Sequence, residues 1–263
     1  MLSTQDLAAA ADLIAAHWRD GKKMHALPDH LRPTSRVEGY AIQAHLEALG
    51  AKPLFGWKIA ATSLDGQRHI NVDGPLAGRL LAERVLAAGE AVSLAGNHMQ
   101  VAEPEFAFRM AETLRPRATA YSLEEVMAAV GALHLAIEIP DSRFIDFTKV
   151  GAPQLIADDA CAHQFLLGPA ADDMWRGLDL GAHELTGTVA GKLTRQGSGR
   201  AVLGDPRLAL AWLANELSGL GIPLAAGQVV TTGTCTIPLP IAPGDSVVVD
   251  YGVLGQIGLH IAA

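Results

Sequence analysis

The chain has 263 residues, of which 49% are hydrophobic and 18% are charged, so it can form one large domain or two small ones with substantial cores. Its 20 Lys and Arg residues are outnumbered by 28 Asp and Glu residues, which gives a formal net charge of −8. This balance argues against a nucleic-acid-binding protein, which needs a basic stripe. It allows an anionic small substrate, because a bound cation can invert the local field.

No targeting signal is evident in the sequence. The N-terminal stretch has no basic flank, and Asp6 and Asp12 interrupt its apolar residues. No segment reaches the roughly 18–20 apolar residues of a membrane helix. Cys161 and Cys235 are too few for a disulfide framework and are expected to be buried free thiols. We therefore expect a soluble cytoplasmic protein without a membrane partner.

The first 50 residues predict a small helical N-terminal unit. Apolar residues recur at helical spacing over Leu7–Trp18, and a turn-rich link covers Gly21–Pro33. Ser35–Glu38 has the form of a capping box, and the helix it opens is expected to run to Gly50, a typical residue after a helix end.

Residues 51–263 predict a β-rich catalytic domain. A helix is expected from the capping box at Ser122 to Gly131, and another after Asp205 and Pro206. Because helices do not alternate regularly with strands, we predict an α+β fold with a mixed or antiparallel sheet. The expected strands cover residues 54–62, 100–110, 133–139, 183–190, 228–234, 246–251 and 256–261.

Two carboxylates share one face of an expected strand. Glu103 and Glu105 are two residues apart, so their side chains leave the same face. Pro104 cannot donate to a strand ladder, which indicates an edge, a bulge or a rim. A solvated outer face would explain the pair, but Phe106 and Phe108 indicate a largely buried strand.

Glu138 lies between Ile137 and Ile139 in another apolar strand, with no Arg or Lys beside it in the sequence. A lone buried charge there would cost several kcal/mol. Convergence of Glu138 with Glu103 and Glu105 on one cation removes this cost. Three oxygen ligands favour Mg²⁺ or Mn²⁺ over zinc.

Lys58 is a second exception, because it places an ammonium inside the apolar strand GWKIAATS. One interpretation is an edge lysine whose head group reaches solvent. The other is an ammonium held near the metal site, where it pairs with a carboxylate or transfers a proton.

These residues fall in segments that together resemble a known family. The segments are GWKIAATS, AEPEFAF, AIEIPDSRF, IADDAC and VVTTGT, the last followed by PGDSVVVDYGVLGQIGLHI. In this order they are similar to the fumarylacetoacetate hydrolase superfamily. The similarity runs from Leu54 to the C-terminus and is greatest to the branch of 2-oxopent-4-enoate hydratases and 4-oxalocrotonate decarboxylases, which act in aromatic-compound catabolism.

The resemblance implies a mixed β-roll fold and a Mg²⁺ or Mn²⁺ site on Glu103, Glu105 and Glu138. It also implies a catalytic role for Lys58. The expected partners are a small 2-oxo acid, further copies of the chain in a homo-oligomer, and a paired decarboxylase or hydratase in a complex.

The resemblance further implies that Thr232, Gly233 and Thr234 line the substrate pocket. The segment Asp141–Arg143 matches the residues that follow the third metal ligand in the family. Either a turn that ends the strand or a place in the pocket would explain it.

The sequence also departs from the hydratase pattern. Leu76 stands where hydratases carry a loop Asp, Cys161 where they carry Ser, and Asp159 where they carry Asn. We expect Leu76 and Cys161 to line the substrate pocket. The missing Asp removes a water-activating base, which Asp73 or His69 could replace.

The chemistry implied is chelation of a 2-oxo acid and stabilisation of its enolate. We expect a hydratase that adds water to a 2-hydroxypenta-2,4-dienoate-like substrate and forms a 4-hydroxy-2-oxo acid. Leu76 favours an alternative, the decarboxylation of a 2-oxo-enedioate such as 4-oxalocrotonate. A third possible function is that of an acylpyruvate-type C–C hydrolase. Such enzymes use a His–Glu pair, for which this sequence offers only His69 near Asp65. A non-catalytic partner subunit is the fourth.

Overall fold

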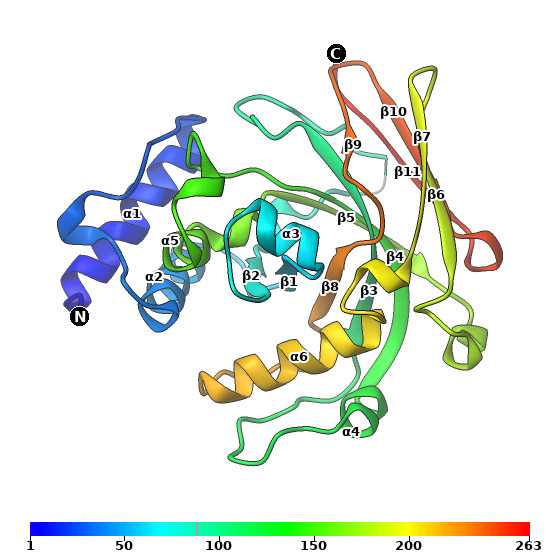
Figure 1. Ribbon diagram of the computed structural model, residues 1–263, viewed down its shortest axis with the longest axis horizontal. Helices are drawn as coiled ribbons and strands as arrows, with labels where there is room; N and C mark the ends of the chain where they lie inside the picture. Colours follow the sequence, from blue (N-terminus) through cyan, green and yellow to red (C-terminus); the bar gives the residue numbers. More distant parts are fainter. Residues whose placement is uncertain (88) are drawn as a thin grey trace.

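The computed structural model describes residues 1–87 and 89–263 and contains two β-sheets with helices around the larger one (Figure 1). The larger sheet has seven strands in the spatial order β2-β1-β8-β3-β4-β5, with β9 paired to β3. The strands are β1 (Gly56–Ala60), β2 (Leu76–Leu80), β3 (Val101–Met110), β4 (Val130–Ile139), β5 (Gln164–Ala170), β8 (Val229–Thr234) and β9 (Leu239–Pro240).

The smaller sheet has four antiparallel strands in the order β11-β10-β6-β7. Its strands are β6 (Glu184–Val189), β7 (Leu193–Ser198), β10 (Ser246–Asp250) and β11 (Gln256–His260). One hydrophobic core joins the two sheets, since Phe106 and Ile137 of the larger sheet share it with Leu185 and Val247 of the smaller. The larger sheet is mixed, because β1 runs parallel to β8 while its other pairs are antiparallel. The predicted mixed β-roll is confirmed.

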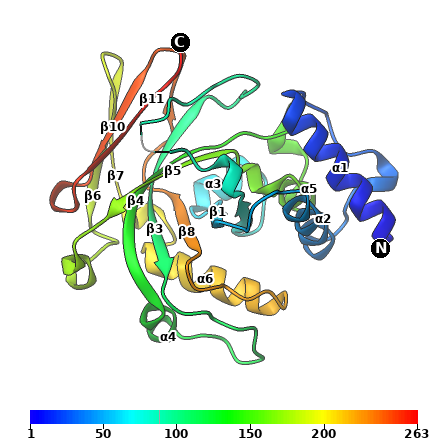
Figure 2. The ribbon, with the colours of Figure 1, turned by 180° about the vertical axis from the view of Figure 1, so that it is seen from behind.

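The α-helices gather around the larger sheet, and the smaller sheet lies at the other end of the molecule, as Figure 2 shows from behind. The helices are α1 (Thr4–Asp20), α2 (Arg36–Ala48), α3 (Leu64–His69), α4 (Leu123–Ala128), α5 (Ala152–Ala157) and α6 (Pro206–Gly219).

The N-terminal helices α1 and α2 form a second hydrophobic core. Ile14 of α1 and Ile42 of α2 lie in it together with Phe144 and with Ala157 of α5. The N-terminal helices thus bury their apolar faces partly against the segment that follows β4. The division into residues 1–50 and 51–263 stays a prediction.

The start of α2 differs from the predicted capping box. The Ser35 side chain accepts a hydrogen bond from the Glu38 backbone, but the Glu38 carboxylate does not return one to Ser35. It accepts hydrogen bonds from Leu2 N (2.7 Å), Thr34 N (2.7 Å) and Thr34 Oγ1 (2.9 Å). These bonds lower the pKa of Glu38 from 4.5 to about 2 and tie the N-terminus to α2.

We therefore expect Glu38→Gln to destabilise the fold in a pH-dependent way. Because the pKa is lower in the folded state, the ionised carboxylate stabilises the fold above pH 4.5, and this stabilisation is lost as the pH falls from 4.5 toward 2. Urea unfolding at pH 7 should show that the free energy of unfolding of the variant is about 2 kcal/mol below that of the wild type. This difference should become smaller at pH 3.5. The exposed control Glu112→Gln should match the wild type. An equal loss at both pH values would contradict the assignment.

Several elements differ from the sequence-based expectation. The helix predicted to end at Gly131 ends at Ala128, because Val130 already pairs with Met110 across a register shift. The elements α3, α5, β2, β5, β7 and β9 were not predicted. They are short, with two to seven residues each.

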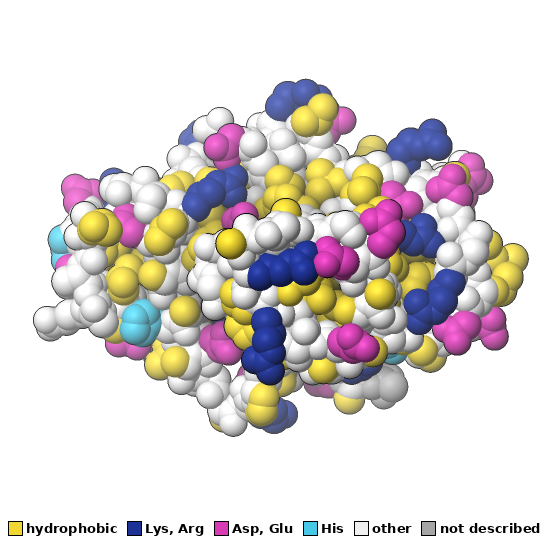
Figure 3. Space-filling view, turned by 90° about the horizontal axis from the view of Figure 1, so that it is seen from below, with side chains coloured by type: hydrophobic (Ala, Val, Ile, Leu, Met, Phe, Trp, Pro, Cys, Tyr) yellow, Lys and Arg dark blue, Asp and Glu magenta, His cyan; other side chains and the backbone are white. Residues whose placement is uncertain are grey.

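The face seen in Figure 3, on the side of α4 and α6, carries basic and acidic side chains interspersed among apolar ones. Within the part of the chain that the structure describes, no helix has both the length and the apolar character needed to cross a membrane. Cys161 and Cys235 are buried free thiols, as predicted.

Candidate metal centre

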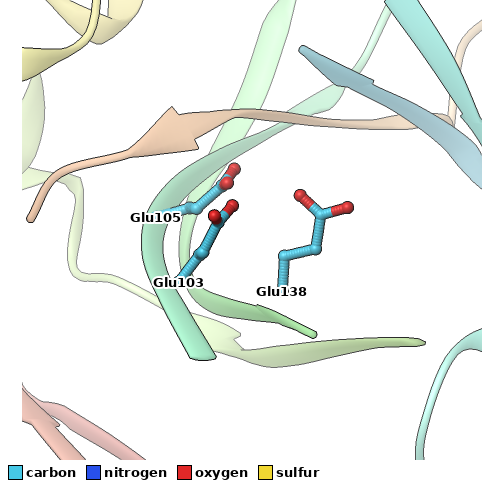
Figure 4. Close-up of side chains that lie close together, drawn as sticks. All are labelled: Glu103, Glu105 and Glu138. Atoms are coloured by element: carbon cyan, nitrogen blue, oxygen red, sulfur yellow. The ribbon is translucent and has the colours of Figure 1, made fainter. Parts of the chain in front are cut away.

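Three glutamates meet on one face of the larger sheet (Figure 4). Glu103 and Glu105 project from β3 toward Glu138 of the neighbouring strand β4. One carboxylate oxygen from each residue lies within 4.8 Å of the others. Glu103 and Glu138 are direct cross-strand partners, an arrangement that is destabilising for two like charges. A cation between them would remove this repulsion.

The two carboxylates of β3 lie beside a register shift between β3 and β8. Glu105 pairs with Thr234 of β8, and Ala107 pairs with Thr231, so the register shifts between them. The extra residue of this bulge is on β8, which advances three residues while β3 advances two, so it is β8 that bends and redirects its side chains here. Pro104 lies beside the shift, where its carbonyl accepts a hydrogen bond from Cys235 N at 2.8 Å. Of the three positions that Pro104 indicated, the structure shows a bulge beside it, with the extra residue on the partner strand β8.

The buried carboxylate oxygens are only partly satisfied. Glu105 and Glu138 are 0% and 1% exposed. Glu105 Oε2 accepts hydrogen bonds from Thr231 Oγ1 and from Gly233 N (2.8 Å). Glu105 Oε1 and both Glu138 oxygens have no hydrogen-bond donor among the described residues. Because unsatisfied buried oxygens are costly, this donor set fits a hard dication.

The electrostatics of the cluster point the same way. Burial raises the pKa of Glu105 well above its usual value, and the neighbouring charges of Glu138 and Glu103 raise it further. Burial, together with Glu138, raises the pKa of Glu103 to about 7. Burial also raises the pKa of Glu138, although Lys58 opposes the shift. Three ionised carboxylates are unfavourable here unless a further cation joins them.

Lys58 lies inside the sheet, on β1 between β2 and β8, and is 3% exposed. Its Nζ is 3.2 Å from Glu138 Oε1, an ion pair without hydrogen-bond alignment, and donates to Ala160 O at 2.8 Å. Burial alone would lower the pKa of Lys58, but the charges of Glu138 and Glu103 outweigh it and raise the pKa. This interior, buried position excludes the interpretation of Lys58 as a lysine at the sheet edge whose head group reaches solvent.

The strand β8 supplies hydrogen bonds to the cluster. Thr231 was not predicted as a site residue, yet its hydroxyl donates to Glu105. Its register opposite Lys58 places it on the same sheet face. Thr232 Oγ1 instead donates to Phe106 O at 2.9 Å, and Thr234 Oγ1 donates to Thr236 O at 3.0 Å. Their part in substrate binding remains a prediction.

Gly233 is required where β8 passes Thr62. Its φ is +109°, and a Cβ added to it would lie 2.2 Å from Thr62 Oγ1. The close approach brings Gly233 N to Glu105. Of the three residues predicted at this turn, Gly233 alone makes a direct hydrogen bond to the glutamate cluster among those the structure describes.

Leu76 lies on the Lys58 face of the sheet. It pairs with Ala60, two residues along β1 from Lys58, and it is fully buried. Asp73 is paired with Arg36, and its side chain is 83% exposed. His69 is exposed and its ring contacts Phe147 edge to face. Neither side chain supplies a buried polar group at the position of Leu76.

The segment 141–143 makes ion pairs and hydrogen bonds within the protein. Asp141 forms a buried ion pair with Lys23. The Ser142 hydroxyl donates to Asp158 Oδ2 at 2.6 Å, and Arg143 forms a buried ion pair with Asp158. These contacts favour the strand-ending turn over a direct place in the pocket.

Comparisons with known proteins show the family and the fold of the chain. A family model described as fumarylacetoacetate hydrolase C-terminal matches residues 69–262. A 2-hydroxyhexa-2,4-dienoate hydratase from Comamonas testosteroni is 34% identical over 233 residues, 86% of each chain. The 2-keto-4-pentenoate hydratase 1 of Dechloromonas aromatica is 30% identical over 265 residues, covering 100% of this chain and 98% of the relative.

The fold also matches a solved structure along its whole length. The 4-oxalocrotonate decarboxylase from Pseudomonas putida G7, complexed with magnesium and adipate, superposes with a TM-score of 0.89 over 99% of both chains, at 24% identity. With a family model over most of the chain and hydratase relatives that align along nearly all of it, this protein belongs to the fumarylacetoacetate hydrolase family.

Proposed function

We propose that this protein is a divalent-metal-dependent hydratase that adds water to a 2-hydroxypenta-2,4-dienoate-like 2-oxo-4-enoate and releases a 4-hydroxy-2-oxo acid. The observation that carries the proposal is the set of buried carboxylate oxygens on Glu105 and Glu138 that accept no hydrogen bond from the described residues, with the ammonium of Lys58 as the ion-pair partner of Glu138. The hydratase relatives, aligned along most of their length, support the reaction class.

Glu103, Glu105 and Glu138 would hold Mg²⁺ or Mn²⁺. When bound, the ion supplies a Lewis acid for the carboxylate and 2-oxo oxygens of the substrate. Thr231 and Gly233 fix the Glu105 carboxylate from behind by donating to Oε2. Three negative side chains thus become a preorganised site for one cation.

Lys58 would hold a proton at Nζ beside the substrate. The buried ammonium, 3.2 Å from Glu138 Oε1, can stabilise negative charge as it develops, and it can donate a proton to the enolate carbon, which is the stronger base. Burial of the side chain excludes bulk water from this transfer. Leu76 adds an apolar surface on the same sheet face.

A direct assay tests the proposal. Purified protein with Mg²⁺ should remove the ultraviolet absorbance of 2-hydroxypenta-2,4-dienoate, and mass spectrometry should show a product with all the carbons plus one water. Addition of EDTA should stop the reaction. Absence of both turnover and divalent-cation binding in the purified chain would overturn the proposal and favour a non-catalytic partner subunit.

Leu76 supports a second candidate, a 2-oxo-enedioate decarboxylase. An apolar residue on the Lys58 face provides no base to activate water, whereas decarboxylation needs none. Release of CO₂ from 4-oxalocrotonate, with no hydration of the dienoate, would establish this reaction instead. A homo-oligomeric state, a complex with a paired enzyme and a cytoplasmic location complete the proposal.

A further inference from the structure

The strongest unexplained feature near the site is a strained turn, residues 159–161, which we call the left-handed turn. Asp159, Ala160 and Cys161 have φ values of +56°, +49° and +63° in succession. Each non-glycine residue in this conformation costs about 1–2 kcal/mol. Three in a row persist only where their surroundings hold them, and such strain clusters at functional sites.

Hydrogen bonds hold both ends of the left-handed turn to the segment that follows β4. Asp158, directly before it, accepts hydrogen bonds from Ser142 Oγ (2.6 Å) and Arg143 N (3.0 Å) and forms the buried ion pair with Arg143. At the other end, Cys161 O accepts from Asp141 N at 3.0 Å. These anchors lie a few residues beyond Glu138.

The opposite side of the turn is fixed to β2. Asp159 Oδ1 accepts a hydrogen bond from Arg79 N at 2.6 Å. The neighbouring Gly78 leaves no room for a side chain, since an added Cβ would lie 2.4 Å from Asp159 O and 2.9 Å from Lys58 Cδ. The turn, β2 and the Lys58 stem are therefore in direct contact, and a methyl group at residue 78 would force them apart.

At the centre of the turn, Ala160 O accepts a hydrogen bond from Lys58 Nζ at 2.8 Å. The same nitrogen lies 3.2 Å from Glu138 Oε1. An ammonium has three donors on a flexible four-carbon stem. Because one hydrogen is directed to a fixed carbonyl and the ammonium is held beside a carboxylate, the position of Nζ is set. Nζ keeps further hydrogens for another acceptor.

We propose that Asp159 is a positioning residue for Lys58: it anchors the left-handed turn to β2, and the Ala160 carbonyl in turn aims the ammonium at the reacting centre. This role rests on the proposed function in one respect, namely that Lys58 transfers a proton in the reaction. The placement of the ammonium itself does not depend on which reaction follows.

The first test compares turnover in four variants. In Asp159→Ala, kcat should fall at least about tenfold, because misplacement by about 1 Å can cost up to 10²-fold. Gly78→Ala should have the same effect. KM and Mn²⁺ affinity should change little in both. Asp159→Asn should retain most of kcat, because its amide oxygen can accept from Arg79 N and Asn tolerates positive φ. The control Gly219→Ala has open space around its Cβ and should match the wild type.

The second test does not require turnover. Reductive methylation followed by peptide mass spectrometry should show a protected Lys58 in the wild type, Asp159→Asn and Gly219→Ala proteins. Lys58 should be labelled several-fold faster in Asp159→Ala and Gly78→Ala. Should Asp159→Ala not fold, Gly78→Ala decides the question, with thermal melting as the check on folding.

The two tests separate the two proposals. A wild-type chain without hydratase activity, in which Lys58 labelling still follows the predicted order, would refute the proposed function and support the positioning role. An active wild type, with kcat and Lys58 labelling unchanged in both Asp159→Ala and Gly78→Ala, would overturn the positioning role. A loss of Mn²⁺ affinity equal to the loss of kcat would also overturn it, because the turn would then act on the metal site.

Discussion

Glu138→Gln should weaken Mn²⁺ binding by at least about 100-fold, since loss of a hydrogen-bonding partner behind a ligand already costs 10- to 100-fold. An amide carries no charge and offers one weaker oxygen in place of a carboxylate that has no other donor among the described residues. Turnover should fall by about 10²- to 10³-fold, the size of the loss when one preorganised electrostatic contact is removed. Isothermal titration with Mn²⁺ measures the first effect and the dienoate assay the second.

The same variant should leave the metal-free fold intact. The substitution removes the repulsion between Glu138 and its cross-strand partner Glu103, and it also removes the ion pair with Lys58, so two opposing effects are lost together. Circular dichroism of the metal-free variant should therefore show the wild-type fold. Saturating Mn²⁺ should then stabilise the wild type by about 2.7 kcal/mol at 100 times its Kd, and the variant far less. Glu184→Gln, on the exposed side of β6, is the matched control. Unchanged Mn²⁺ affinity in Glu138→Gln would refute the metal site.

Lys58→Met should lower kcat by about 10²- to 10⁴-fold, the usual contribution of a positioned proton donor. Methionine keeps most of the length and apolar volume of the buried stem and removes the ammonium. Because that ammonium is a competing cation 3.2 Å from Glu138, Mn²⁺ affinity should stay the same or increase. This outcome differs from that of Glu138→Gln, in which affinity and turnover fall together.

The surface variant Lys22→Met is the control for this experiment, since Lys22 is exposed and contacts only Asp20 among the ion pairs found in the described residues. A Lys58→Met enzyme with full kcat would exclude the lysine from the reaction. One with strongly reduced Mn²⁺ affinity would make Lys58 a structural support of the site instead.

The metal cluster could be predicted because each of its residues conflicts with its local surroundings. Glu103 and Glu105 share a strand face, and Glu138 interrupts an apolar strand with no partner in sequence. Such conflicts between local pattern and burial are expected at functional sites. The structure brings the three residues together, but their metal ligation and the role of Lys58 stay predictions.

Thr231 and the left-handed turn could not be predicted in the same way. The position of Thr231 depends on the parallel register of β1 and β8, which no local pattern records. The strain at residues 159–161 is maintained by hydrogen bonds with Arg79 on β2 and with Arg143 after β4. The sequence IADDAC alone is typical of an ordinary short helix end. The strand β2 was not predicted because its sequence, LAGRL, contains a glycine and an arginine and so lacks the apolar pattern of a buried strand. The burial of its residues arises from their contacts in the folded protein.

The parallel pairing of Gly56 with Val229 also governs how the protein can be made. Contacts between segments so distant in the chain form slowly, because a long loop must close first. During synthesis the two donors on β8, Thr231 and Gly233, are made long after Glu105, so the Glu105 carboxylate lacks these hydrogen bonds until β8 joins the sheet. A nascent chain stalled before β8 would therefore carry all three glutamates of the cluster and yet lack the hydrogen bonds that fix the Glu105 carboxylate.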